Sequence, residues 1–356
     1  MGFDDLVEWV ARVPLKSNKQ HPQLEFKTEA FCQRYESMLA TMEYVRLKTK
    51  IPVPRVHHYD LTSENILCRP YILMDYLPGK PLSSCFDDLT QPKLRNIVKR
   101  WAEYTMELSK HQFPEIGSLF KEENNFVIKK LLPNEITHLY DHRGPFRSVA
   151  DYLFSMSAIK KRAIASQNTN PHRYQDFLRS SLLESLIPMF ILPEHLNGPF
   201  VLSHRMFDMN SILVDTNYGT ITGVLSWQMA AILPLACHIR VPDSLNYDLA
   251  APEYQLKEPA KVKFSTRYRT FFEKCLCDAG KGSGWDCENL IERSLIWDLF
   301  ERAICNLADE KYFDALWQYV YGPKVESCEL TRKAMENAHW GVAMADRWGI
   351  AVEGHD

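Results

Sequence analysis

Residues 198–228 read GPFVLSHRMFDMNSILVDTNYGTITGVLSWQ, and they decide how the rest of the chain is interpreted. Three short apolar runs in this stretch have the length and the β-branched content of strands. These runs are 200–202, 212–214 and 221–225. A polar loop that begins at His204 separates the first two runs, and a turn at residues 217–219 separates the last two. The stretch therefore predicts a strand, a loop rich in hydrogen-bonding side chains, and a hairpin.

The chain before this stretch changes from strands to helices. Short β-branched or aromatic runs predict strands at Val7–Pro14, Val56–Tyr59 and Tyr71–Tyr76. In Glu29–Thr49 and Gln91–His111 apolar residues recur at steps of three and four, which is typical of amphipathic helices. The turn at Leu77–Pro81 is expected to be a hinge, and the chain after it is expected to be mainly helical, interrupted once by residues 198–228.

Four segments carry a resemblance to a known family. They are TKIPVPRV (49–56), PYILMDYLPGKPL (70–82), IGSL (116–119) and GPFVLSH (198–204). In sequence and in order they closely resemble successive conserved-position segments, or landmarks, of the aminoglycoside phosphotransferase-like family, in the subset that is abundant in fungi. The resemblance runs from about Val7 to Trp227, and it implies an α+β, protein kinase-like two-lobe fold.

The resemblance also implies a division of the chain. We expect a truncated small N-lobe of a few antiparallel strands plus one helix (1–77), a hinge and linker (78–90), and a large, mainly helical C-lobe (91–356) that contains a degenerate catalytic loop (203–228). The chain starts about where the third strand of the family does. Gly2 is the only glycine before Gly79, so no glycine-rich phosphate loop is expected.

Members of this family transfer the terminal phosphoryl group of a nucleotide to a small-molecule hydroxyl. The resemblance implies a basic residue paired with a helix Glu, an Asp and an Asn in the catalytic loop, and a second Asp that holds magnesium. Aligned without gaps, the catalytic Asp position holds Met206, the Asn position holds Ser211, and the magnesium Asp position holds Ser226. Arg12 occupies the basic position, but its Glu partner is replaced by Met38.

These replacements predict a pseudokinase. A general base contributes roughly 10²- to 10⁴-fold to a rate, and magnesium adds several kcal/mol of charge stabilisation. A thioether at Met206 accepts no proton, and neither Ser211 nor Ser226 carries a carboxylate. No cofactor-binding residue and no metal ligand is therefore expected. ATP and magnesium belong to the alternative of a residual atypical ATP-dependent phosphotransferase.

Two further functions stay open. In the first, the interlobe cleft binds a small hydrophobic molecule, and a metal-free cyclisation or isomerisation there would place the protein in fungal secondary-metabolite biosynthesis. The methionines at positions 38 and 206 make such a site apolar. In the second, the chain is a non-catalytic interaction or regulatory protein whose partner is unknown.

The loop offers three candidate catalytic residues, His204, Asp208 and Asn210. A His suits proton transfer near neutral pH, and a shifted loop would let Asp208 and Asn210 replace the missing acid and amide. The competing interpretation is structural. There His204 fixes the loop backbone, Asp208 is ancillary, and Asp215 caps the amides of the following turn.

Composition and the N-terminal sequence indicate where the protein is located and which partners it lacks. A formal net charge of -3 gives no basic field for nucleic acid. Nine scattered cysteines are typical of reduced, intracellular thiols. The acidic start at Asp4 and Asp5 lacks the features of an export signal. No run of apolar residues is long enough to span a membrane. We therefore expect a cytoplasmic protein without membrane insertion.

Overall fold

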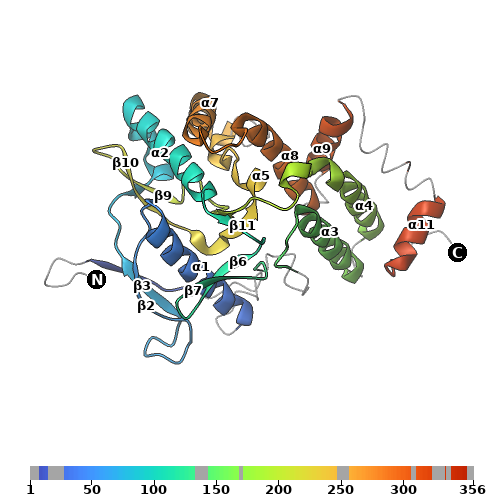
Figure 1. Ribbon diagram of the computed structural model, residues 1–356, viewed down its shortest axis with the longest axis horizontal. Helices are drawn as coiled ribbons and strands as arrows, with labels where there is room; N and C mark the ends of the chain where they lie inside the picture. The colour runs from blue at the N-terminus through green and yellow to red at the C-terminus, as the bar shows by residue number, and fades with distance from the viewer. Residues whose placement is uncertain are drawn as a thin grey trace. The chain divides into compact units, whose positions relative to one another are not determined.

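The computed structural model describes residues 8–14, 28–132, 143–167, 171–246, 256–305, 310–322, 333 and 338–350 (Figure 1). The chain divides into two compact units, the first formed by residues 1–132 and 199–291 and the second by residues 133–198 and 292–356. Every site residue predicted from the sequence lies in the first unit. The expected lobe boundaries, after residues 77 and 90, also fall within the first unit and stay a prediction.

The first unit begins with a three-stranded antiparallel sheet and a helix. Its strands are β1 (Trp9–Arg12), β2 (Val56–Asp60) and β3 (Tyr71–Asp75), with β3 in the middle. Helix α1 (Glu29–Lys48) starts at Thr28, whose side-chain oxygen accepts a hydrogen bond from the Phe31 N–H at 3.2 Å. It ends before the prolines at 52 and 54, which cannot continue a helix.

Two further three-stranded sheets surround the loop of residues 204–211. One has the order β10-β9-β4 and the other β11-β8-β5, and all neighbouring strands are antiparallel. The strands are β4 (Lys80–Pro81), β5 (Gln112–Phe113), β8 (Phe200–Ser203), β9 (Ile212–Asp215), β10 (Thr220–Val224) and β11 (Ala231–Pro234). Every residue of β8 and β11 is buried, so the loop leaves from a rigid core strand.

One expectation for the helical part is wrong. A second interruption exists, because β6 (Ser118–Glu122) and β7 (Asn125–Lys129) pair as an antiparallel hairpin. The two residues between them include Glu123, which adopts a positive φ of 52°. Glu rarely occupies this conformation, so the turn lacks the Asn-Gly or Asp-Gly signal that normally marks a short hairpin.

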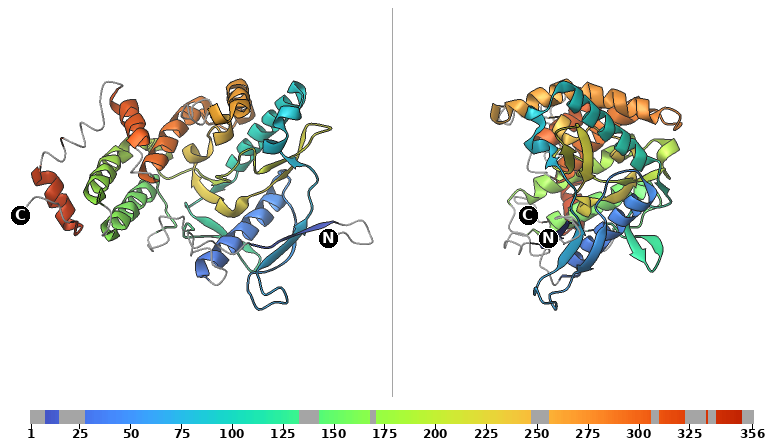
Figure 2. Two further views of the ribbon diagram at one scale, coloured as in Figure 1. Left: turned by 180° about the vertical axis from the view of Figure 1, so that it is seen from behind. Right: turned by 90° about the vertical axis from the view of Figure 1, so that its left-hand side faces the viewer.

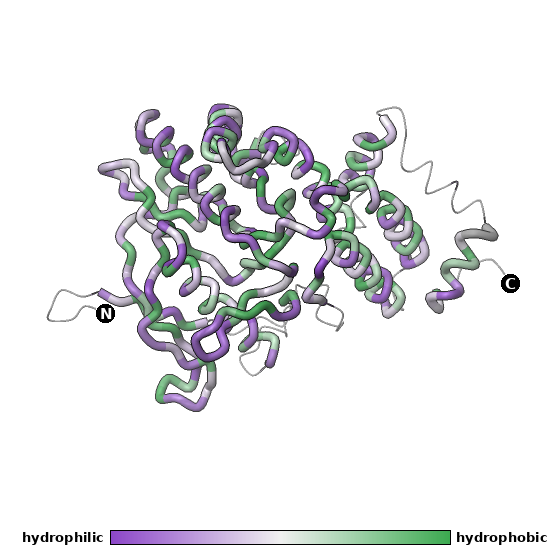
Figure 3. Tube along the Cα trace, in the orientation of Figure 1, coloured by the Kyte–Doolittle hydropathy of each residue, from purple (hydrophilic) through white to green (hydrophobic). Residues whose placement is uncertain are grey.

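Helices α2 (Gln91–Ser109) and α7 (Pro259–Gly280) lie side by side in the first unit (Figure 2). The Trp101 ring of α2, which is fully buried, meets the Phe272 ring of α7 at 5.7 Å between centroids. Polar and apolar residues alternate along α2 with the helical period (Figure 3). A short helix, α5 (Leu235–His238), follows β11 directly and contacts β8.

Short 3₁₀ helices complete the connections. They are η2 (Leu82–Ser84), η3 (Phe86–Asp88), η4 (Pro193–His195), η5 (Trp227–Met229) and η6 (Asp243–Leu245). Of these, η5 follows the hairpin β9–β10 and packs against α1. This contact joins the end of residues 198–228 to the first helix of the unit.

The second unit is helical in its described residues. Its helices are α3 (Val149–Ser166), α4 (Arg173–Phe190), α9 (Glu310–Tyr321) and α11 (Ala338–Arg347), together with most of α8 (Cys287–Cys305), which starts in the first unit. An ion pair joins α3 and α4, with Nζ of the buried Lys161 at 2.9 Å from Oε1 of the partly exposed Glu184. No helix among the described residues is both long and apolar enough to cross a bilayer.

Candidate functional site

The loop between β8 and β9 is closed by short backbone hydrogen bonds. The Met206 N–H donates to the His204 carbonyl at 2.8 Å, and the Asp208 N–H donates to the Met206 carbonyl at 2.9 Å. Each bond closes a three-residue turn, and Arg205 at the centre of the first has a positive φ of 63°. The tight turns leave the Met206 side chain 42% exposed, although the flanking strands are buried.

His204 is a buried positioning residue in this loop. Its Nε2–H donates to the Leu225 carbonyl at 2.7 Å, and its ring lies against the Trp227 ring at 4.4 Å between centroids. Burial lowers the pKa of His204 from 6.5 to about 4, so the ring is neutral near pH 7. Because only 1% of the residue is exposed, the contact ties the loop to residues 225–227 and offers a ligand almost no surface.

Asp208, Asn210 and Ser211 bond with one another inside the loop. The Ser211 hydroxyl accepts from the Asp208 N–H at 3.1 Å and donates to the Asp208 carbonyl at 2.9 Å. An Asp208 carboxylate oxygen accepts from the Asn210 N–H at 2.8 Å. These bonds hold the loop conformation, and Ser211 is 1% exposed. The Ser211 hydroxyl is therefore occupied within the loop, while Asp208 also lines the pocket described below.

Ser226 stands where the backbone is left-handed, with φ 67° and ψ 41°. The preceding Leu225 N–H donates to the Ser211 carbonyl at 2.8 Å, so the two segments that the resemblance assigns to magnesium binding are joined directly. A side chain other than Gly in this conformation costs of order 1–3 kcal/mol. The loop architecture is thus present, and a hydroxyl stands where the resemblance predicts a carboxylate.

Arg12 and Met38 meet although they come from β1 and α1. Nη1 of Arg12 lies 3.5 Å from Sδ of Met38. The guanidinium also lies over the Tyr35 ring, 5.8 Å from its centroid. A thioether is a weak acceptor, so this contact is much weaker than the ion pair that the resemblance predicts at these positions.

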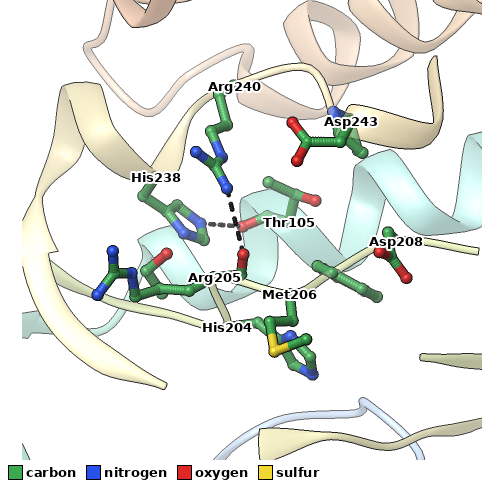
Figure 4. Close-up of a pocket in the computed structure, with 11 residues that line it drawn as sticks. Thr105, His204, Arg205, Met206, Asp208, His238, Arg240 and Asp243 are labelled. Atoms are coloured by element: carbon green, nitrogen blue, oxygen red, sulfur yellow. Dashed lines mark hydrogen bonds between the residues drawn. The ribbon is translucent and has the colours of Figure 1, made fainter. Parts of the chain in front are cut away.

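A small pocket lies beside the loop (Figure 4). The Nε2–H of His238, on α5, donates to the Thr105 carbonyl of α2 at 2.8 Å, and Nη2 of Arg240 donates to the Arg205 carbonyl at 3.2 Å. In Figure 4 the His204 ring lies on the opposite side of the loop from His238 and Arg240. Burial lowers the pKa of His238 to about 4 as well.

Sequence reasoning missed Thr105, His238, Arg240 and Asp243 as pocket residues. They follow or lie in helical segments far from the loop in the chain, and no motif marks them. The cavity has a volume of about 50 Å³. Sites for small organic ligands are usually about 300–1,000 Å³, so this pocket alone does not hold the hydrophobic molecule expected in the cleft.

The described side chains around the loop do not form a metal site. Within the part of the chain that the structure describes, no group of three or more His, Cys, Asp or Glu side chains is arranged to hold an ion. The predicted structural role of Asp215 is confirmed, because its Oδ1 accepts from the Asn217 N–H at 2.7 Å and from the Tyr218 N–H at 3.1 Å.

The α+β fold, with its loop between β8 and β9 and the hairpin that follows, defines a kinase-like phosphotransferase scaffold. The model of the phosphotransferase enzyme family (APH) matches residues 8–239. This chain belongs to that family.

Curated relatives come from fungi. A subtelomeric hrmA-associated cluster protein of Aspergillus fumigatus is 26% identical over 275 residues, which cover 61% of this chain and 54% of that protein. Clavilactone A biosynthesis cluster protein Y of Ampulloclitocybe clavipes is 22% identical over 229 residues, which cover 60% and 54%. The chain thus spans about half the length of these relatives.

Solved structures include a thermostable mutant of aminoglycoside phosphotransferase APH(4)-Ia in its apo form. It is 13% identical to this chain, the match covers 81% of this chain and 85% of that one, and the TM-score is 0.45.

Proposed function

We propose that this member of the phosphotransferase family is a pseudokinase, which does not transfer phosphoryl groups by the magnesium-dependent route. One observation carries the proposal. The loop keeps its hydrogen-bonded architecture, while Met206 presents a thioether and Ser226 a hydroxyl at the two positions where the resemblance predicts carboxylates. Phosphoryl transfer depends almost entirely on positioning and charge stabilisation, so these two replacements remove its main requirements.

The alternative of a residual atypical phosphotransferase depends on Asp208 and Asn210. The Asp208 carboxylate is engaged by the Asn210 N–H at 2.8 Å, and its backbone is held by Ser211 on both sides. Moving Asp208 to the position of Met206 would break all three hydrogen bonds. The geometry therefore favours the structural role for Asp208.

The assay of this proposal is turnover of MgATP, with and without a panel of hydroxyl compounds. We expect no hydrolysis or transfer above the rate without protein. Turnover that is lost in Asp208→Asn and kept in Asp215→Asn would contradict the proposal and would identify Asp208 as a working acid or base.

The pseudokinase is further proposed to work by binding a hydrophobic small molecule, with any transformation of it independent of metal and ATP. Support comes from Met206, a large apolar residue that is 42% exposed in the loop between β8 and β9. The relatives named after biosynthesis and gene clusters in fungi agree with a role in secondary metabolism.

A neutral hydrophobic dye such as Nile red tests this second step. We expect its fluorescence to rise with the parent protein and with Met206→Leu, and to fall with Met206→Asp, which adds a charge at an apolar contact. Equal binding by Met206→Asp and Met206→Leu would show that the dye does not use this site.

The interaction-protein alternative has its own observation. Ile66 is 98% exposed and the adjacent Leu67 is 52% exposed, in the connection between β2 and β3. Exposed apolar side chains mark protein contacts when they belong to a contiguous patch. A stable complex lost in Ile66→Ser/Leu67→Ser would favour this function over the binding of a small molecule.

A further inference from the structure

A second and larger cavity lies away from the catalytic loop, between α1, β2 and the hairpin β6–β7. Its volume is about 630 Å³, which falls within the range typical of sites for small organic ligands. It shares no residue with the pocket of Figure 4. Neither the family relationship nor the proposed function uses this cavity.

Helix α1 contributes one continuous stripe to the cavity. Glu36, Leu39, Glu43 and Arg46 follow one another at steps of three and four and therefore share one face of the helix. Met38, which contacts Arg12, lies on the buried side of the same helix and does not line the cavity. The cavity is therefore separate from the degenerate Arg12–Met38 site.

The charges around the cavity are unevenly satisfied. On the hairpin side, Lys121 pairs with Glu43 at 2.7 Å, and Lys129 pairs with Glu122 at 2.8 Å. Four cationic side chains line the cavity against two carboxylates, with His57 and His58 beside them. Once Lys121 and Lys129 are paired, the charged lining residues that are left are Arg46, Arg55 and Glu36, so the balance stays positive.

The guanidinium groups of Arg46 and Arg55 have no hydrogen-bond or ion-pair partner among the described residues. The main chain of Arg55 is fixed, because its N–H donates to a carboxylate oxygen of Asp75 at 3.0 Å and its carbonyl accepts from the Asp75 N–H at 2.9 Å. Arg46 is held in the last turn of α1. Both residues thus have a fixed main chain, and both line the same cavity. A guanidinium binds carboxylates and phosphates through paired N–H donors.

The other residues that line the cavity suit the apolar part of a ligand. Leu39, Pro54, Val56 and the rings of Tyr59 and Phe120 line the same space. A purely inorganic anion would leave these surfaces unused. An organic anion would place its charged group on the arginines and its apolar part against the aliphatic and aromatic side chains.

We infer that the cavity between α1, β2 and the β6–β7 hairpin binds an organic anion, a carboxylate or phosphate monoester with an aromatic or aliphatic body, through Arg46 and Arg55. This site is independent of the pseudokinase proposal, since none of its residues belongs to the catalytic loop.

The test is calorimetric titration with three small probes that share a phenyl ring: phenyl phosphate, benzoate and benzyl alcohol. We expect at least one of the two anions to bind, and benzyl alcohol to bind at least about tenfold more weakly because it carries no charge. Comparison of phenyl phosphate with benzoate then tells which anion the site prefers.

Substitution of the two arginines tests whether the anion binds in this cavity. Arg46→Gln/Arg55→Gln is expected to weaken the preferred anion by at least about tenfold, while Arg69→Gln, an exposed arginine outside the cavity, leaves affinity unchanged. Because Arg46 and Arg55 are exposed, the double variant is expected to fold, and its thermal unfolding checks this. The inference is overturned if neither anion binds at millimolar concentration, if benzyl alcohol binds equally well, or if the folded double variant binds like the parent.

Discussion

Nη1 of Arg12 lies 3.5 Å from Sδ of Met38, so the basic residue of β1 and the middle of α1 meet without a carboxylate between them. Met38 is 2% exposed. The resemblance predicts a carboxylate at position 38, as it does at positions 206 and 226, and the thioether of Met38 brings no negative charge to Arg12.

The Arg12–Met38 contact predicts that a carboxylate can be restored. In a double-mutant cycle with Arg12→Gln, Met38→Glu is expected to show a favourable coupling energy of about 1–3 kcal/mol, because a buried carboxylate left without its arginine is costly. Urea unfolding of the four proteins measures this, with Met38→Gln as the uncharged control. A coupling energy near zero for Glu would mean that the two side chains do not share one site.

The left-handed backbone at Ser226 predicts a gain in stability from residues that tolerate it. Ser226→Gly is expected to raise the free energy of unfolding by about 0.5–1 kcal/mol, and Ser226→Asn is expected to raise it less. Ser226→Val should lower it by about 1–2 kcal/mol, because a β-branched residue fits this conformation poorly. Chemical denaturation gives the comparison. Ser63→Gly, at a residue without a positive φ, serves as control and is expected to lose stability.

The two buried histidines predict how stability depends on pH. Burial lowers the pKa of His204 and of His238 from 6.5 to about 4 in the folded chain. As the pH falls, the unfolded chain therefore takes up protons first. Above pH 6.5 both histidines are neutral in the folded and the unfolded chain, so they do not make the free energy of unfolding depend on pH. As the pH falls from 6.5 towards about 4, the free energy of unfolding decreases by up to about 1.4 kcal/mol per pH unit for each histidine.

Unfolding free energies at a series of pH values check this dependence. His238→Gln, whose amide can still donate to the Thr105 carbonyl, should remove about one proton from the slope between pH 6.5 and 4. His58→Gln, at an exposed position on β2, serves as the comparison. An unchanged slope in His238→Gln would show that His238 is not held neutral by burial.

Gly79 in the turn after β3 predicts a site that tolerates no side chain. It has a φ of +131°, and an added Cβ would lie 2.8 Å from the Val214 carbonyl oxygen of β9. Gly79→Ala is expected to lower stability by more than about 2 kcal/mol, since both the backbone and a main-chain contact must shift. Gly282, with a φ of +83° and open space around it, is the matched control. Gly282→Ala should lose only about 1 kcal/mol, and equal losses at both positions would remove the steric part of the explanation.

Local patterns predicted most elements of the first unit well. The helix expected at Glu29–Thr49 is observed at Glu29–Lys48, and the one expected at Gln91–His111 is observed at Gln91–Ser109. Apolar residues recur in these helices at steps of three and four, and the helix ends are clearly marked, so the sequence alone predicts their positions. The strand runs at 56–59, 71–76 and 212–214 also coincide with β2, β3 and β9.

Pairing between distant strands was less accessible to sequence reasoning. The apolar run at 200–202 predicted the strand β8 but not its partners, and in the structure β8 pairs with β11 and β5. The run that forms β11 is continuously apolar and carries no alternation that would reveal its partner. β5 has only two residues, which is too short for any periodic signal.

The candidate site shows the same limit. The resemblance marked Arg12, Met38, Met206 and Ser226 residue by residue, since the family has a functional residue at each of these aligned positions. It gave no sign of Arg46 and Arg55, because exposed arginines are common and only the fold places these two at one cavity.

Thermal unfolding with and without MgATP tests the central claim most directly. A ligand at a hundred times its dissociation constant stabilises a protein by about 2.7 kcal/mol, a shift of several degrees for a chain of this size. The account predicts no magnesium-dependent shift for the parent protein, and a measurable shift only after Met206→Asp/Ser226→Asp. A shift of several degrees in the parent, lost when magnesium is chelated, would contradict the assignment of this chain as a pseudokinase.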